Sequence, residues 1–540
     1  MMAASVAAVV VLALAGAAIP AQAQTPTTLY DFPGGNTGFN DPEAWATAQG
    51  RDGNLYSTSI SGALFQATPS GTVNIFANIG YGVISGATLG TDGSFYGTNQ
   101  DGGPGGCGDA GCGQVYKVTP AGVETILHSF TNTGDGSDPY SAPIEAANGV
   151  FYGTTPTENN GSNRTVYTVT PSGAFTTIHT FTGADGQNVT APLVQGTDGD
   201  FYGVTVAGGT SNVGVIFKMT PSGAVHVLHN FAGTDGSAAF YALIQANDGN
   251  FYGTTYRGGS IGNGVVFKIT PGGDYSVVHN LNLSNGDGDG PSSGLIQASN
   301  GLLYGVTGSV NSGNYGTIYS VDVNTGIFTT LYSFTDTTDG DNPQSPLRQH
   351  TNGLLCGCTF SGGDFSVCAG HGCGVFFSLD VGAPALAGLV STSGKEGAEI
   401  GILGQGFSSS SVVKFDGVAA SFPPQGTTFI NATVPAGALT GKVTVTTGAT
   451  TLKSNEAFRV TPTFASFSPP SGPVTTPVTL TGTGLAQTTK VTFGGVKATT
   501  VTVNSDTQVT ADVPAGALTG KIEITTKGGH VGSTSDFTVN

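Results

Sequence analysis

One tetrapeptide, Phe-Tyr-Gly-Thr, recurs along this chain about every fifty residues and constrains its fold more than any other feature. Four close copies stand at 95–98, 151–154, 201–204 and 251–254, and three looser copies stand at 55–58, 303–306 and 355–358. A period of this length built from strands is typical of solenoids, arrays and β-propellers. A propeller of seven blades can close into a ring.

Two turn signals divide each repeat into four short strands. An Asx-Gly pair such as Asp248-Gly249 stands directly before the tetrapeptide, and it is a strong hairpin signal because both residues tolerate a positive φ. A Thr-Pro-x-Gly turn, as at 270–273, follows the third strand, with Pro at the turn position that it favours. Examples of the four strands, A to D, are 242–245, 251–253, 266–270 and 227–231. Four antiparallel strands make one propeller blade.

The two ends of the repeat region are complementary. Leu29-Tyr30-Asp31-Phe32 reads as a D strand with no blade before it, and the seventh repeat ends at Phe377-Ser378-Leu379-Asp380 without a D strand. The first segment can complete the last blade, which removes two open sheet edges. We therefore predict an all-β fold in which residues 24–382 form a closed seven-bladed β-propeller.

Residues 383–540 follow a different pattern. The run Val-Pro-Ala-Gly-Ala-Leu-Thr-Gly-Lys occurs at 434–442 and again at 513–521. Short Val- and Thr-rich strands separated by Gly and Pro turns indicate small β-sandwiches. We expect one sandwich at 383–460 and a second at 461–540.

Both parts of the chain resemble known families. The C-terminal units resemble immunoglobulin-like IPT/TIG domains through Phe-Ser-Pro-Pro-Ser-Gly at 467–472, Thr-Gly-Thr-Gly at 481–484 and the repeated Val-Pro-Ala-Gly run. The preceding repeats resemble the GloVer-type tandem repeats of bacterial choice-of-anchor surface proteins. Their G-x-V-F-K-x-T-P-x-G core stands here at 264–273, close to Tyr-Gly-Thr-Thr at 252–255. The resemblance implies a cell-surface protein and no defined activity.

The N-terminus and the net charge limit where the protein works. Residues 2–19 are almost wholly apolar and precede Ala21-Gln22-Ala23, so we expect residues 1–23 to be a signal peptide. No later stretch approaches the roughly 20 apolar residues that cross a bilayer. Acidic residues outnumber Lys and Arg by 34 to 16, and the net charge of -18 disfavours nucleic acids and anionic membranes as partners. We expect a monomer that is secreted or held at the cell surface, with no membrane span.

The loops of the blades indicate where a ligand would bind. D–A and B–C connections share one face of a propeller, and A–B and C–D turns share the other. The turns here are tight, so we expect the site on the first face. Its D–A loops carry recurrent acids, namely Asp135, Asp185, Asp235, Asp287 and Asp339, with Asp138, Asp289 and Asp341 nearby. These acids either bind a cation or a polyhydroxylated ligand, or they cap their own turns.

One of these loops resembles a calcium loop. Residues 285–290 alternate Gly with Asp287 and Asp289, a pattern that calcium sites favour, although the downstream Glu of an EF-hand is missing. Calcium is the cofactor for which the sequence offers a site, and we expect no other. The remaining ligand-binding candidates are Asp135, Asp138, Asp185, Asp235, Asp339 and Asp341.

The His and Cys residues have structural explanations. His128, His179, His229 and His279 occupy a strand D position that holds Tyr or Phe in other blades, which indicates packing and not metal binding. Cys107 with Cys112, and Cys368 with Cys373, stand in corresponding B–C loops, and each pair predicts a disulfide in an exported chain. Cys356 and Cys358 are thiols, a strained disulfide, or a metal site with His371; we favour the first two.

No catalytic motif is present: the sequence contains no G-x-S-x-G elbow, H-E-x-x-H helix or P-loop. We predict a non-enzymatic, exported binding or adhesion protein. A propeller face would present a site for an extracellular polysaccharide or another cell-surface ligand, and the IPT/TIG domains would act as spacers. The alternative is a secreted polysaccharide hydrolase or lyase on a β-propeller. A purely structural surface protein is a third interpretation.

Overall fold

The computed structural model describes residues 24–33, 48–59, 62–80, 82, 85–103, 107, 111–156, 164–308, 313–335, 337–368, 372–423 and 426–540. The predicted signal peptide, residues 1–23, lies outside them. The described residues form β-strands and one short 3-10 helix, Leu283–Asn285. Within these ranges, no helix has the length and apolar character needed to span a membrane.

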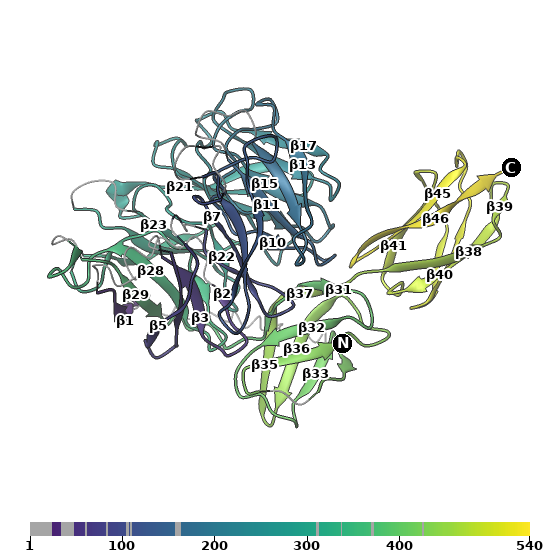
Figure 1. Cartoon of the computed structure of the whole chain (residues 1–540). Helices are drawn as coiled ribbons and strands as arrows, with labels where there is room; N and C mark the ends of the chain where they lie inside the picture. Colours follow the sequence, from purple (N-terminus) through teal and green to yellow (C-terminus); the bar gives the residue numbers. More distant parts are fainter. Residues whose placement is uncertain are drawn as a thin grey trace, which may run out of the picture.

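The repeats form seven small antiparallel sheets arranged as a propeller (Figure 1), each with the strand order predicted for one blade. Blade 1 is β2–β5 (Ala48–Gln49, Leu55–Thr58, Ala63–Ala67, Val73–Asn78), blade 2 is β6–β9 (Thr88–Leu89, Phe95–Asn99, Gln114–Val118, Glu124–Ser129) and blade 3 is β10–β13 (Ile144–Glu145, Phe151–Thr155, Thr165–Val169, Phe175–Thr180). Blade 4 is β14–β17 (Val194–Gln195, Phe201–Val204, Val215–Met219, Val225–Asn230), blade 5 is β18–β21 (Ile244–Gln245, Phe251–Thr255, Val265–Ile269, Tyr275–Asn280) and blade 6 is β22–β25 (Ile296–Gln297, Leu303–Thr307, Thr317–Val321, Phe328–Ser333).

The seventh blade is closed by the N-terminal strand, as predicted. It contains β27 (Arg348–Gln349), β28 (Leu355–Ser361) and β29 (Val375–Leu379), and β1 (Thr27–Asp31) pairs antiparallel with β29. A short extra strand, β26 (Asp341–Pro343), also pairs with β28. Phe32, directly after β1, is buried. The two ends of the repeat region therefore share one sheet, and the ring is closed.

A β-bulge in strand D explains the glycine of the Thr-Pro-x-Gly turn. The C–D pairing shifts register in blade after blade, and β1 shifts between Thr28 and Tyr30 in the same way. The bulged residue turns its carbonyl toward the next blade. A Cβ on Gly71 would lie 2.2 Å from the Leu29 carbonyl oxygen, and a Cβ on Gly223 would lie 2.1 Å from that of Ile178. No side chain fits at such a distance, so this contact between blades requires glycine.

The Phe-Tyr-Gly strand is structural. The Tyr ring of one blade stacks on the Phe ring of the next, with 3.8 Å between the ring centroids of Tyr96 and Phe151 and 3.9 Å between those of Tyr202 and Phe251. The glycine serves a contact within the blade, because a Cβ on Gly203 would lie 2.5 Å from the ring of Phe217 on the paired strand. This glycine therefore makes room for a ring of its own blade, not for the neighbouring blade.

The C-terminal part consists of two β-sandwiches, as predicted. In the first, β30 (Gly388–Leu389), β32 (Glu399–Leu403) and β35 (Phe429–Thr433) face β31 (Ser393–Gly394), β37 (Thr450–Val460), β36 (Gly441–Thr447), β33 (Val412–Phe415) and β34 (Val418–Ala420). In the second, β38 (Thr463–Ser468), β40 (Pro477–Thr483), β44 (Gln508–Asp512) and β43 (Val501–Ser505) face β39 (Ser471–Gly472), β46 (Gly529–Val539), β45 (Gly520–Thr526), β41 (Thr488–Phe493) and β42 (Val496–Lys497). Their strand orders correspond, apart from β43.

The two sandwiches meet at a polar joint. The Thr440 N–H donates to the Gln487 side chain at 2.8 Å. Glu396 of the first sandwich faces Asp506 of the second, and burial together with the Asp506 carboxyl raises the pKa of Glu396 to about 7. Figure 1 shows the first sandwich against one end of the propeller, with the second extending beyond it.

Candidate ligand-binding site

The recurrent acids of the D–A loops are each bonded within their own blade. The Nε2 atoms of His128, His179, His229 and His279 lie 3.2, 2.9, 2.9 and 2.8 Å from the carboxylates of Asp135, Asp185, Asp235 and Asp287, respectively. In blade 6 the Tyr332 hydroxyl donates to Asp339 at 2.8 Å instead. Each of these strand D residues and its loop acid therefore form a pair that the sequence shows only as two separate repeated positions.

The same carboxylates also cap their loops. Backbone N–H groups donate to them, for example from Thr182 to Asp185 at 2.8 Å and from Ala232 to Asp235 at 2.8 Å. Burial on its own would raise the pKa of Asp185, but the hydrogen bonds from the Thr182 backbone and hydroxyl hold it below its usual value. This is the turn-capping alternative that the sequence left open.

The other predicted acids are also engaged. The Ser137 hydroxyl donates to Asp138, and the Ser361 hydroxyl donates to Asp341. Asp289 Oδ1 lies 3.7 Å from Arg257, but this buried atom accepts no hydrogen bond among the described residues. In the part of the chain that the structure describes, no three His, Cys, Asp or Glu side chains converge as a metal site would require. Calcium at Asp287 and Asp289 stays a prediction.

The His and Cys predictions can be compared directly with the geometry. The His128 ring stacks on Phe175 of the next blade with 3.6 Å between centroids, so it is a packing residue. Both predicted disulfides, Cys107–Cys112 and Cys368–Cys373, are present. Cys356 and Cys358 are free and buried, and burial raises the pKa of both thiols to about 12. His371 lies outside the described residues.

The inner A strands carry a feature that the sequence analysis missed. Their second residue is usually Gln, and its side-chain oxygen accepts a backbone N–H from the A–B turn of the preceding blade. These contacts are Ala147 to Gln195, Thr197 to Gln245, Asn247 to Gln297, Ser299 to Gln349 and Thr351 to Gln49, with Glu145 accepting from Thr91. The bond from Thr351 to Gln49 joins blade 7 to blade 1. We call these residues the Gln ring.

The first sandwich is docked on the face that carries the A–B turns, which we call the turn face. The Asn455 amide donates to the Gln297 carbonyl at 3.2 Å and to the Gln349 side chain at 3.0 Å. Arg459 donates to the Gly196 carbonyl at 2.9 Å. The Arg51 guanidinium lies 4.5 Å above the Phe429 ring. This sandwich is therefore a cap on the propeller, and the prediction that it is a spacer is wrong.

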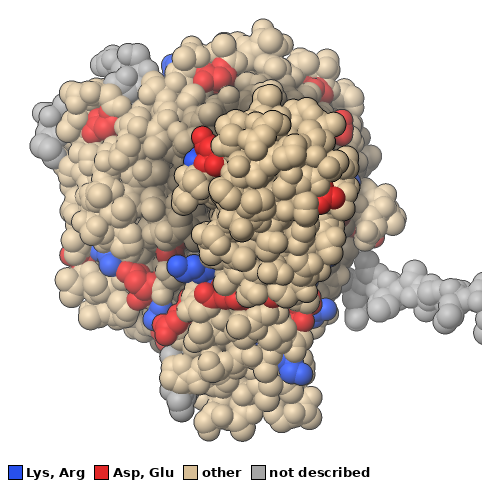
Figure 2. Space-filling view, turned by 90° about the vertical axis from the view of Figure 1, so that its right-hand side faces the viewer, with Lys and Arg blue, Asp and Glu red and all other residues tan. Residues whose placement is uncertain are grey.

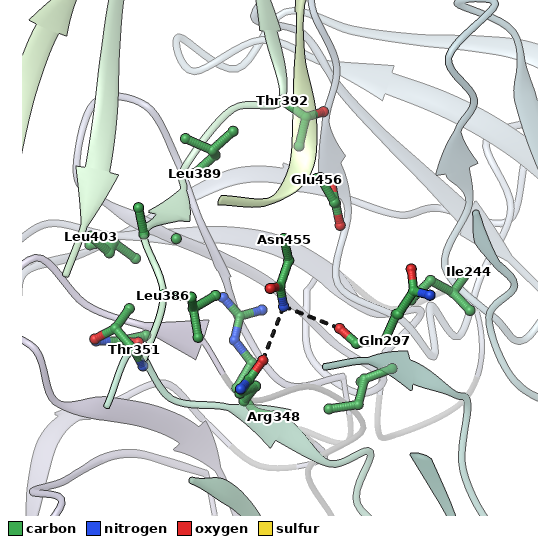
Figure 3. Close-up of a pocket in the computed structure, with 15 residues that line it drawn as sticks. Ile244, Gln297, Arg348, Thr351, Leu386, Leu389, Thr392, Leu403, Asn455 and Glu456 are labelled. Atoms are coloured by element: carbon green, nitrogen blue, oxygen red, sulfur yellow. Dashed lines mark hydrogen bonds between the residues drawn. The ribbon is translucent and has the colours of Figure 1, made fainter. Parts of the chain in front are cut away.

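Docking leaves a partly open cavity of about 300 Å³ between the A strands and the first sandwich, which we call the interface cavity. Its polar lining includes Arg348 of β27, Asn455 and Glu456 of β37, and Gln297. Its apolar lining includes Ile244, Ile296, Leu386, Leu389 and Leu403. In Figure 3 Asn455 lies between Arg348 and Glu456, and its dashed hydrogen bonds run to the propeller. The expectation that the turn face has little room for a site is thus wrong.

Two opposite charges in this cavity lack protein partners. Among the described residues, the Arg348 guanidinium makes no hydrogen bond and has no carboxylate within 4 Å. Within the same part of the chain, the Glu456 carboxylate accepts no hydrogen bond and has no Lys, Arg or His nitrogen within 4 Å. Solvent reaches both side chains through the cavity. Loss of bulk water nevertheless lowers the pKa of Arg348, although Glu456 acts in the opposite direction.

Glu456 lies at the centre of a cationic cluster. Burial raises its pKa, while Arg348, Lys442 and Arg459 act to lower it. Lys442 is already bonded to the Asn247 side chain and the Asn455 carbonyl, and Arg459 to Gly196. A second cavity of about 290 Å³ shares Ile244, Thr392 and Glu456 with the first. Glu456 is therefore accessible from two sides.

One signal in the sequence could have identified Arg348. The first residue of strand A is Ala48, Thr88, Ile144, Val194, Ile244, Ile296 and Arg348 in blades 1 to 7. A charge that stands in one blade alone departs from the repeat. Glu456 carries no comparable signal, because only docking brings it to the propeller.

Comparison with protein families supports the two-part organisation. The model of the Gloeobacter/Verrucomicrobia repeat matches residues 18–195, 83–281 and 222–418, which together span more than half of the chain. The IPT/TIG domain model matches residues 462–539. Of the two predicted IPT/TIG domains, the second is thus confirmed. The first sandwich has a corresponding strand order but is not matched by the IPT/TIG model. Repeats and a TIG domain fit a surface or binding protein.

Similar solved structures add no functional argument. A fungal alcohol oxidase of the AA5 family, in complex with copper, is 14% identical over 96% of this chain and 100% of its own, with a TM-score of 0.45. TolB from Acinetobacter baumannii is 15% identical (50% and 60% covered, TM-score 0.32), and a gluconolactonase from Xanthomonas campestris is 12% identical (52% and 91% covered, TM-score 0.33). No curated protein matches the sequence.

Proposed function

The chain belongs to the Gloeobacter/Verrucomicrobia repeat family, and from that premise and the capped propeller we propose that it is an exported, non-enzymatic binding protein. The ligand occupies the interface cavity, on the turn face of the propeller. The two disulfides fit an oxidising location outside the cytoplasm.

The observation that carries this proposal is the pair of unpartnered charges. Arg348 and Glu456 are exposed to the solvent of the interface cavity, so their hydrogen-bonding groups are open to a ligand. Asp198 and Asp235 have protein partners, Lys218 and His229 respectively. Arg348 and Glu456 lack such partners but line a cavity. A ligand with groups of opposite charge can pair with both of them.

Two features of the cavity favour binding over catalysis. Glycoside hydrolysis uses two carboxyl groups on opposite sides of the bond, and Glu456 is the one carboxylate among the residues that line the interface cavity. Its volume of about 300 Å³ suits a small molecule. A polysaccharide would enter by a chain end only.

The test uses the mature chain, residues 24–540, on a panel of neutral, uronate and amino oligosaccharides and free amino acids. Wild type, Arg348→Ala and a matched control, Arg257→Ala, are compared for retention and for release of new sugar ends. Arg257 is half-exposed and lies near Asp289 on the opposite, loop-bearing face. We expect Arg348→Ala alone to lose binding.

Two results would overturn this proposal. Binding that survives Arg348→Ala but is lost in an Asp287→Ala/Asp289→Ala variant would move the site to the D–A loops. Release of new sugar ends would make the protein a carbohydrate-active enzyme, the alternative that the sequence left open.

A further inference from the structure

We propose that the interface cavity binds a small zwitterion with an aliphatic body, its carboxylate on Arg348 and its ammonium group on Glu456. This proposal rests on the function proposed above and names the class of ligand.

Arg348 is the anchor for an anion. A guanidinium offers five N–H donors in a planar fork that matches a carboxylate. The other cations near Glu456 have donated to protein atoms, Arg459 to Gly196 and Lys442 to Asn247. Arg348 is the cation of this cluster whose donors face the cavity without an acceptor in the described chain. An incoming carboxylate would satisfy it.

Glu456 is the complementary acceptor. An ionised carboxylate only accepts hydrogen bonds, so it needs donors from the ligand. Arg348 and Glu456 influence each other electrostatically but do not touch. A ligand that carries a cation beside its own anion can lie between them. A simple carboxylic acid would satisfy Arg348 and leave Glu456 without a partner.

The remaining walls select an aliphatic body of limited size. Ile244, Ile296 and Leu386 line the cavity, and their apolar surface favours a hydrocarbon group. The Asn455 amide nitrogen donates two hydrogen bonds to the propeller, so this side chain shapes the cavity. A leucine-sized molecule fits a volume of about 300 Å³.

The excess of positive charge around the cavity makes the carboxylate of the ligand a stronger anchor than its ammonium group. Arg348, Lys442 and Arg459 surround one carboxylate, although the chain as a whole has a net charge of -18. Figure 2 shows a face that is largely uncharged, with acidic side chains scattered over it and Lys and Arg side chains mainly in its lower half. The site is a local cationic region in an acidic protein.

The test is calorimetric titration of residues 24–540 with three probes of one shape: L-leucine, 4-methylpentanoate and 3-methylbutylamine. The second lacks the ammonium group and the third lacks the carboxylate. We expect leucine to bind, the acid to bind about tenfold more weakly and the amine about 100-fold more weakly. Glu456→Gln should remove the difference between leucine and the acid, and Arg348→Met should remove binding of both.

Matched variants separate the site from the fold. Glu399→Gln changes a carboxylate of the same sandwich that accepts from Asn431 at 2.6 Å and lines a neighbouring cavity, and it should bind leucine as wild type does. Arg348→Lys keeps the charge without the fork and should bind leucine with intermediate affinity. Unchanged thermal unfolding of the Arg348 variants would confirm that they fold.

The outcomes distinguish this proposal from the one on which it rests. If leucine does not bind but another member of the panel binds in an Arg348-dependent way, the ligand class is wrong and the binding function stands. If no probe depends on Arg348, the two charges are a water-bridged pair that holds the cap, and both proposals fail. Leucine binding that is equally tight in Glu456→Gln would show an anion site without recognition of the ammonium group.

Discussion

The D–A loops and the interface cavity differ in whether their charges have protein partners. On the face of the D–A loops, Asp185 and Asp235 find a His and a backbone N–H within the same blade. On the turn face, Arg348 and Glu456 come from the propeller and the first sandwich and find no partner. Repeated charges are satisfied locally because the repeat carries both partners. Arg348 and Glu456 stand outside the repeat and have no such partner, so they mark the better candidate for a site.

The largest effect should come from breaking the Gln ring where it supports the cap. Gln349 accepts from Ser299 and Asn455 and donates to Ser299 and Gly353. Gln349→Leu leaves these buried groups unpaired and should cost about 3 kcal/mol of unfolding free energy. It should also weaken leucine binding, because it releases Asn455. Urea unfolding and calorimetry measure the two effects.

Gln195→Leu is the matched control for that variant. Gln195 belongs to the same ring, where it accepts from Ala147 and donates to Gly199, with no hydrogen bond to the sandwich. It should lower stability by a smaller amount and leave binding unchanged. If it weakens binding as much as Gln349→Leu, the ring and not the sandwich contact shapes the cavity.

The next effect concerns the loop face. Asp235→Ala removes the acceptor of His229 and of the Ala232 N–H and should cost about 1 kcal/mol, because the pair is partly exposed. Ligand binding should not change. Asp235→Asn keeps an acceptor for the N–H and should recover part of the loss in denaturant unfolding. A loss of binding in Asp235→Ala would shift the site to this face.

A smaller effect concerns pH: ionisation of Asp185 on the loop face and of Glu456 in the interface cavity should change the unfolding free energy in opposite directions. The pKa of Asp185 is held low, burial being outweighed by the hydrogen bonds from Thr182, so its contribution to stability is present above the pKa of an unfolded Asp and is lost as the pH falls. The pKa of Glu456 is raised by burial, so its ionisation opposes folding increasingly as the pH rises from the pKa of an unfolded Glu to its folded pKa. Glu456→Gln should therefore be more stable than wild type at neutral pH, and this gain should vanish below about pH 4. Thermal unfolding across this range measures it, and a destabilised Glu456→Gln at neutral pH would contradict the assignment.

The smallest expected effect is that of calcium. Asp287 is occupied by His279 and the Asn282 N–H, so we expect neither calcium nor EDTA to change the melting temperature of residues 24–540. Binding at 100 times the dissociation constant would add about 2.7 kcal/mol. A calcium-dependent rise that disappears in Asp287→Asn/Asp289→Asn would establish the calcium site that the sequence pattern indicates.

Much of the propeller could be predicted because its signals are local and repeated. Asx-Gly and Thr-Pro-x-Gly specify turns through backbone conformations that these residues favour, and the complementary ends indicated closure. The hydrogen bonds between the strand D His residues and the loop Asp residues could not be predicted, because the sequence shows the two sets only as separate repeated positions. Arg348 could have been found as the exception in strand A, whereas the partners of Gln349 in the neighbouring blade could not.

The sequence by itself determined the number of blades, the strands in each, the disulfides and the two sandwiches, because neighbouring residues in the chain encode turns and alternating strands. Only the tertiary structure decided which face carries a cavity. Docking of the first sandwich depends on side chains separated by more than 100 positions, such as Gln349 and Asn455, and no local pattern records that match. Arg348 and Glu456 share one cavity for the same reason.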